Sequence, residues 1–218
     1  MMKAKNDSVR AAAAISAVGA AATALGGIAV QAIVQPATTV PDDRWSYPWS
    51  STALIPISIL WASLHVLIFC GVLGFARSGI AGTSRGARLG AVAALAGTAT
   101  LFVGELASIA VRNQFIDDTG ATIVGAIFGI AILLTAVGFL AVGIATIRAG
   151  GWYGWRRLTP LSAGIASCAL LGLNSTKALP AGVALYGLCL LALGMALYTQ
   201  PTSEKPARSV RTVRQHAT

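Results

Sequence analysis

Two titratable side chains lie within otherwise apolar stretches of the sequence, and they are the first candidates for chemistry. Glu105 is the single charged residue in the 23-residue run from Leu89 to Val111. An acidic side chain at mid-membrane depth costs roughly 2.5–3.5 kcal/mol, so such a residue faces a partner, a cavity or an ion path. Glu105 could therefore act as a general acid, a proton carrier or a cation site, with His65 as its catalytic partner.

The relative depth of these two side chains decides whether they can meet. Glu105 lies seven residues before Arg112, so it is about 10 Å below the outer boundary of its segment. His65 lies about 20 Å down when counted from Thr52 and about 14 Å down when counted from Pro56. Only the second estimate permits a direct hydrogen bond, so we expect the two side chains to be linked by water or unpaired.

Further polar side chains are expected at the level of Glu105 or closer to the outer boundary. They are Gln31, Ser108, Asn174 and Lys177. Together with Glu105 they form a candidate ligand-binding site that opens outward. The alternative is a polar cluster without a cavity, in which Lys177 or Arg112 reaches down and neutralises the carboxylate.

The composition excludes several other classes of site. The three cysteines contain no C-x-x-C pair, and His65 is the one histidine near membrane depth, so neither a metal site nor a redox centre is expected. No cofactor is predicted. The net charge of +9 would suggest nucleic acid for a soluble protein, but no nucleic-acid motif is present, so nucleic acid is not an expected partner.

The chain is too apolar for a soluble domain. Hydrophobic residues make up 56% of it and charged residues 11%, against about 25% charged in soluble domains, and the mean hydropathy is +0.73. We therefore predict an all-α, polytopic transmembrane helical bundle. The expected segments are 11–34, 52–75, 89–111, 121–147, 158–174 and 179–198, between an N-terminal segment 1–10 and a basic tail 199–218.

The first segment has a second interpretation, because a basic start and small residues near Gln31 also occur in secretory signal peptides. Its apolar run of about 24 residues exceeds the roughly 7–15 residues of a signal core, which favours a retained helix.

The basic residues give an independent test of this division. If the N-terminus is cytoplasmic, 13 of the 16 basic residues fall inside, and only Arg44, Arg112 and Lys177 fall outside. This asymmetry is what the positive-inside rule predicts for six helices with both termini in the cytoplasm. The expected location is the inner (plasma) membrane, as a multi-pass protein whose partners are membrane lipids and a small or lipidic ligand.

Small and aromatic residues each have two interpretations. Spacings of four residues connect Gly125 with Gly129, and Gly164 with Cys168 and Gly172. Such stripes indicate tight helix packing, with a homo-oligomer contact as the alternative. Two aromatic clusters, at 45–49 and 152–155, are typical of membrane interfaces, and the first could instead form a lid over an outer cavity.

Several motifs support a resemblance to a known group. They are Pro48-Trp49-Ser50, the segment around His65, Gly104-Glu105-Leu106-Ala107, and the stretch GWRRLTPL at 154–161. With them the chain resembles small, uncharacterised six-helix bacterial integral membrane proteins over most of its length, which implies the fold and no particular activity. In size and in its intramembrane acid it is also similar to membrane-embedded terpene cyclases. Those enzymes protonate a prenyl substrate with carboxylates from different helices, whereas this sequence has one such carboxylate.

Three functions follow from these residues. The main prediction is an inner-membrane protein that binds or transports a small or lipidic ligand in an outward-facing polar pocket around Glu105. The alternatives are a membrane enzyme on a lipid-soluble substrate such as a prenyl compound, with Glu105 as its acid, and a structural subunit of a complex. An apolar cavity with Glu105 in its wall would favour the enzyme, and a polar path past His65 would favour transport. A Glu105 capped by Lys177 or Arg112, without a cavity, would favour the structural role.

Overall fold

The computed structural model describes residues 2–174 and 176–200, and this part of the chain contains helices and no strand. The first helix comprises α1 (Met2–Ala29), a π-helical turn η1 (Val30–Val34) and α2 (Gln35–Ala37). The others are α3 (Ser51–Ser78), α4 (Arg85–Ala110), α5 (Thr119–Ala149), α6 (Thr159–Leu173) and α7 (Leu179–Tyr198), and a short 3₁₀ turn, η2 (Gly154–Leu158), precedes α6.

Within the described residues, the structure confirms the all-α prediction of six principal helices. Five of them, including the first helix from Asp7 to Ala37, are long and apolar enough to cross a membrane. The exception is α6, whose 15 residues extend about 22 Å against a hydrocarbon core of about 30 Å.

The helix boundaries differ most from expectation at the N-terminus. The first helix begins at Met2 and not at residue 11, so the expected polar segment 1–10 is helical from its second residue. The basic tail predicted from residue 199 lies outside the described residues from position 201 onward.

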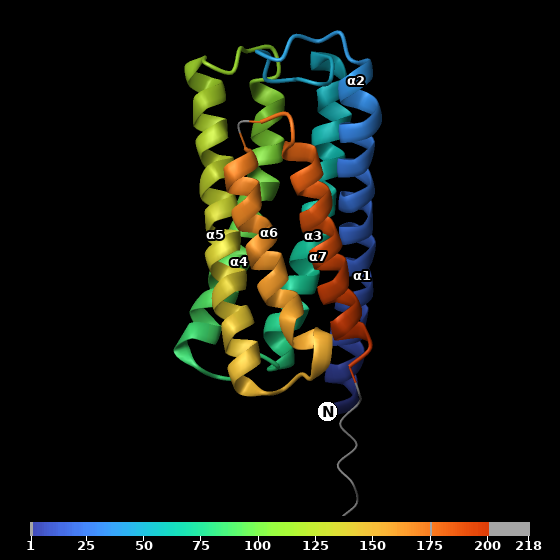
Figure 1. Cartoon of the computed structure of the whole chain (residues 1–218), viewed down its shortest axis with the longest axis vertical. Helices are drawn as coiled ribbons and strands as arrows, with labels where there is room; N and C mark the ends of the chain where they lie inside the picture. The colour runs from blue at the N-terminus through green and yellow to red at the C-terminus, as the bar shows by residue number, and fades with distance from the viewer. Residues whose placement is uncertain (1, 175, 201–218) are drawn as a thin grey trace, which may run out of the picture.

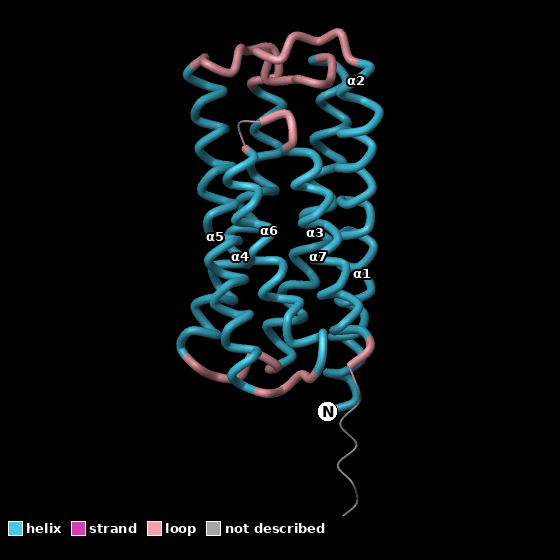
Figure 2. Tube along the Cα trace, in the orientation of Figure 1, coloured by secondary structure: helices cyan, strands magenta, loops and turns pink. Residues whose placement is uncertain are grey.

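The six principal helices form a closed ring. Each helix packs on its sequence neighbours, and the ring closes where the first helix contacts α7 (Figure 1). Figure 2 shows that the connections lie at the two ends of the bundle. We call the end with loops 38–50 and 111–118 the cavity end, and the end with the N-terminus and loops 79–84 and 150–153 the terminal end.

The ring is filled by apolar side chains toward the terminal end. Ile68, Phe139 and Leu190 are almost completely buried there, and the rings of Phe75 and Trp152 pack with their centroids 5.7 Å apart. Trp152 is 4% exposed, so it is a core residue and not the interfacial residue we expected. Tyr153 and Trp155 of the same cluster are exposed.

Glycines allow a close contact between α4 and α5. A Cβ atom on Gly97 would lie 2.6 Å from the backbone nitrogen of Thr135. Of the two predicted stripes of small residues, one position packs tightly as expected and others do not. Gly164 packs against Leu140, whereas a Cβ on Gly129 or Gly172 would meet no atom of another described element within 4 Å.

Candidate functional site

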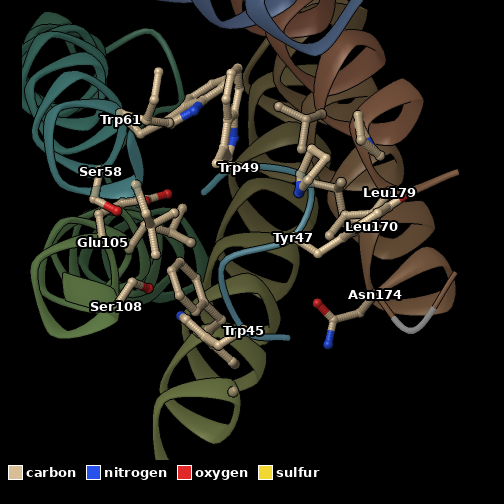
Figure 3. A pocket seen from close by; sticks show the side chains of 18 of the residues that line it. Trp45, Tyr47, Trp49, Ser58, Trp61, Glu105, Ser108, Leu170, Asn174 and Leu179 are labelled. Carbon is tan, nitrogen blue, oxygen red and sulfur yellow. The ribbon is translucent and has the colours of Figure 1, made fainter. Parts of the chain in front are cut away.

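A cavity of about 770 Å³ occupies the interior of the ring at the cavity end (Figure 3). All six principal helices contribute to its wall, which is largely aromatic and aliphatic. Its innermost residues include His65, Thr135 and Ser167, and beyond them the apolar core begins. The cavity is therefore closed toward the terminal end.

Glu105 and His65 meet in the inner part of this cavity. The distance from His65 Nε2 to Glu105 Oε1 is 3.6 Å, and their side chains are 9% and 17% exposed respectively. Both residues line the cavity. The two side chains are thus direct neighbours, closer than the depth estimate suggested, although 3.6 Å is longer than a hydrogen bond.

Side-chain direction explains why the depth estimate was misleading. His65 lies 14 residues below the start of α3 and Glu105 five residues below the end of α4, which are about 21 Å and about 8 Å along the helix axes. In an α-helix the side chain leans toward the N-terminus of its own helix. Because α3 and α4 are antiparallel neighbours, His65 leans toward the cavity end and Glu105 toward the terminal end. The two side chains therefore close the gap between their backbones.

Three buried polar atoms in the cavity wall have no hydrogen-bond partner among the described residues. They are Ser58 Oγ, His65 Nδ1 and the Tyr186 hydroxyl oxygen. A buried polar group without a partner loses roughly 1–3 kcal/mol, so each of these atoms carries a cost in stability where it lies. Ser108, by contrast, donates its hydroxyl proton to Gly104 O at 3.0 Å.

Sequence reasoning missed Ser58 and Tyr186 as lining residues. A signal existed for Ser58, because it lies seven residues before His65 and two helical turns place both side chains on one face. Tyr186 gave no comparable signal, since nothing in the sequence shows that α7 turns this face toward α3 and α4.

Aromatic side chains form the part of the wall nearest the cavity end. Trp45, Tyr47 and Trp49 of loop 38–50 line the cavity together with Trp61 of α3 and Phe128 of α5. The rings of Trp45 and Phe128 are tilted against each other with centroids 6.4 Å apart. The aromatic cluster at 45–49 thus lies over the outer part of the cavity, in the position expected for a lid, which was the alternative to a membrane-interface role.

Hydrogen bonds hold this lid in place. The backbone N–H of Trp45 donates to Gln114 O at 3.0 Å, and that of Ile116 donates to Asp43 O at 2.9 Å, which joins loops 38–50 and 111–118. Within the first loop, the Thr38 hydroxyl donates to Pro48 O at 2.7 Å. The lid is therefore fixed on the α4–α5 side of the ring.

The mouth of the cavity lies between this lid and the hairpin of α6 and α7, whose tip ends below the other loops in Figure 1. Asn174, Thr176, Lys177 and Asp42 line the cavity here. Lys177 Nζ lies 3.0 Å from Asp42 Oδ2, and both side chains are exposed. The hydrogen bond and then the charge of Lys177 lower the pKa of Asp42, and the same contact raises the pKa of Lys177.

The structure brings together most, but not all, of the predicted site residues. Glu105, His65 and Ser108 lie in the inner part of the cavity, and Asn174 and Lys177 lie at its mouth. Gln31 is not among the lining residues. Its side chain donates to Gln35 Oε1 at 3.1 Å and accepts the N–H of Ala181 at 3.3 Å, so it joins the π-helical turn to α7.

The two cations that could have neutralised Glu105 bind elsewhere. Lys177 pairs with Asp42, and Arg112 donates to Ile109 O at 2.8 Å. The described residues contain no group of three or more His, Cys, Asp or Glu side chains that could hold a metal ion. The arrangement can provide a carboxylate, an imidazole and hydroxyl groups to a molecule that enters the cavity.

Comparisons with protein-family models, with curated proteins and with solved structures found no match for this chain.

Proposed function

We propose that this chain is a multi-pass membrane protein that binds a lipid-soluble ligand in the cavity, with the polar end of the ligand against Glu105 and His65. One observation carries this proposal: a cavity of about 770 Å³ with a largely apolar wall has one carboxylate at its closed end. Ligand sites are typically apolar hollows of about 300–1,000 Å³ with a few well-placed polar groups.

The apolar core favours binding over transport across the bundle. A transport path would need polar or hydrated side chains beyond His65, but Ile68, Phe75 and Phe139 are buried there. The described part of the chain gives no support to a continuous polar route from the cavity to the terminal end.

A purely structural role has less support. That role predicted a Glu105 capped by Lys177 or Arg112 without a cavity. Both cations have other partners, and the space beside Glu105 is open.

A membrane enzyme is the second candidate, and the pairing of Glu105 with His65 favours it. A carboxylic acid beside an imidazole can transfer a proton to a bound substrate when both lie within hydrogen-bond reach of it. In this case wild-type protein would convert the bound substrate into a product, an isomer included, that chromatography separates from it, and the H65Q variant would not.

The charge distribution supports six membrane spans with both termini in the cytoplasm of a bacterial cell. Arg77 and Arg148 end their helices at the terminal end, and Arg85, Arg88 and Arg156 lie at the same end. The positive-inside rule places that end in the cytoplasm. The mouth of the cavity then faces the outer leaflet of the inner membrane, and α6 together with η2 forms the shortest span.

Native mass spectrometry of the purified protein tests the binding proposal. Gly125 lines the cavity, and a Cβ on it would meet only Trp45, at 3.9 Å, so Gly125→Leu places a side chain in the cavity. Gly129 lies one turn later on α5, does not line the cavity and has open space around it, so Gly129→Leu is the matched control. We expect a co-purified ligand on wild type and G129L but not on G125L. The same bound mass on all three proteins would contradict the proposal.

A further inference from the structure

We infer that the ligand is a lipophilic organic cation, meaning a quaternary or protonated tertiary amine attached to an apolar body. This inference rests on the proposed function and specifies its ligand class. It combines two features of the inner cavity, a carboxylate without a cationic side-chain partner other than an imidazole, and aromatic rings around the same space.

The charges that face the cavity favour a cation. Glu105 is the acidic side chain of the inner cavity, and the other lining acids, Asp42 and Asp43, lie in the lid. The lining cations are already engaged. Lys177 pairs with Asp42, whereas Arg44 lies 3.9 Å above the Phe115 ring and donates to Asn113 O at 3.2 Å.

An apolar surrounding strengthens this preference. The attraction between opposite charges grows as the local dielectric constant falls, and it is several times larger near protein than in bulk water. An anionic ligand would meet repulsion from Glu105 in the same environment. A neutral ligand would leave the carboxylate without a charge partner when His65 is neutral.

Aromatic rings provide the second half of the recognition. In the view of Figure 3, Glu105 projects between Trp49 and Trp61 on one side and Trp45 on the other, and all three indoles line the cavity toward its mouth. Tryptophan faces attract cations within about 6 Å of the ring centroid, and aromatic residues recognise quaternary ammonium groups in this way. A cationic head directed toward Glu105 would thus meet these indoles on the side of the mouth.

The rest of the wall fits an apolar body. Ile57, Leu170, Leu179 and Val183 line the cavity beside and below the mouth. A ligand could enter from the outer leaflet between the lid and the hairpin of α6 and α7, with its head directed toward Glu105. The volume of about 770 Å³ suits a ligand of drug-like size.

A pair of isosteric probes tests the charge requirement. Benzyltrimethylammonium and neopentylbenzene have the same shape, but the first has a positively charged nitrogen where the second has a carbon. Their binding to the full-length protein in nonionic maltoside micelles is followed by tryptophan fluorescence, because three indoles line the cavity. The proteins compared are wild type, Glu105→Gln and Asp117→Asn, the last of which removes an exposed acid at the same end that does not line the cavity.

We expect wild type and D117N to bind the cation, and E105Q to bind it at least about tenfold more weakly because the charge attraction is lost. Binding of neopentylbenzene should differ by less than about twofold among the three proteins, because the apolar wall is unchanged. If E105Q does not fold, Trp49→Leu gives a second test. It should weaken cation binding by roughly 2- to 30-fold more than it weakens binding of the neutral probe, because both probes lose the same apolar contact and only the cation loses the attraction to the ring.

Two results would overturn the inference, and they differ in what they say about the proposed function. Equal affinity for both probes, unchanged in E105Q and W49L, would exclude a cation site while preserving a ligand-binding cavity. Absence of binding of either probe to wild-type protein would contradict the cation site, and together with an absence of co-purified ligand it would contradict the proposed function as well.

Discussion

At the scale of single residues, the contact between Glu105 and His65 accounts for the polar inner end of the cavity. The two side chains approach to 3.6 Å from antiparallel helices, and His65 Nδ1 has no partner among the described residues. The imidazole therefore has one nitrogen beside the carboxylate and a second that is buried without a partner. Neither residue would be accommodated as easily on the lipid-facing side of its helix.

Replacing His65 tests the energetic role of this contact. His65→Leu leaves the Glu105 carboxylate without its polar neighbour, and we expect it to lower the free energy of unfolding by about 1 kcal/mol, because polar contacts between membrane helices average about 0.6 kcal/mol and reach about 1.7. His65→Gln keeps a donor and should lose less. Unfolding in mixed micelles with increasing denaturing detergent gives the comparison. A more stable H65L protein would show that the contact is not favourable.

At this scale the sequence predicted identities better than distances. Glu105 stood out because it is charged within an apolar run, and His65 because no second histidine lies near membrane depth. Their contact was missed because the estimate compared heights along the helix axes and ignored the direction in which each side chain leans. Gln31 was predicted from its height alone, and its hydrogen bonds direct it toward α7.

At the scale of elements, the close contact of α4 and α5 depends on glycine. Gly97→Leu would force its side chain against the backbone of α5, because a Cβ at position 97 would lie only 2.6 Å from the backbone nitrogen of Thr135. The two helices would therefore have to separate. We expect a loss of roughly 1–3 kcal/mol in unfolding free energy, as for other overpacked sites. The same denaturing-detergent titration measures it, with Gly129→Leu as the control because nothing lies within 4 Å of that position. Equal stability of the two variants would contradict this packing.

The lid and the hairpin of α6 and α7 are joined across the mouth by Lys177 and Asp42. Lys177→Gln and Asp42→Asn should each speed the exchange of a bound ligand, because one connection across the entrance is lost. The double charge reversal of D42K with K177D should restore the wild-type rate. Stopped-flow tryptophan fluorescence measures the rate, and unchanged kinetics in both single variants would contradict a role of the pair at the entrance.

The same pair predicts the pH range of slow exchange. The pKa of Asp42 is lowered below its ordinary 3.8. The stabilisation of the closed entrance by Asp42 is therefore complete above pH 3.8 and is lost as the pH falls through the lowered pKa. The pKa of Lys177 is raised above 10.5. The stabilisation of the closed entrance by Lys177 is therefore complete below pH 10.5 and is lost as the pH rises through the raised pKa. Exchange rates in the K177Q variant should not show these two transitions.

Elements were predicted well where hydrophobicity defines them and less well where capping and local geometry do. The last helix, expected at 179–198, has the bounds Leu179–Tyr198. The first helix continues to Ala37 through the π-helical turn at Val30–Val34, which no composition pattern indicated. The sequence predicted a loop at 35–51 between the first two segments, with an aromatic cluster at 45–49. The position of loop 38–50 as a lid depends on hydrogen bonds to loop 111–118, which is distant in the sequence.

At the scale of the whole molecule, the closed ring makes an internal cavity possible. Six helices in a ring leave a central space that large side chains fill at the terminal end and leave open at the cavity end. The sequence could not predict this space, because it depends on which face of each helix points inward and on how far the hairpin of α6 and α7 extends.

The orientation of the ring in the membrane is a further prediction. In a protein whose cysteines at positions 70, 168 and 189 are replaced, single cysteines are introduced by Thr176→Cys at the mouth and Thr83→Cys in loop 79–84, where both native side chains are exposed. A membrane-impermeant maleimide on intact cells should label T176C and not T83C, because the positive-inside rule predicts that the basic terminal end faces the cytoplasm. Labelling of T83C alone would show the opposite orientation.

The central claim is that a ligand occupies the cavity with its polar end at Glu105. A crystallographic or electron-microscopy map of the full chain, purified with lipids of its own membrane, tests it most directly. We expect continuous non-protein density that starts beside the Glu105 carboxylate and extends past Trp49 and Trp61 toward the mouth. A cavity that contains only ordered water, or that side chains have closed, would contradict it.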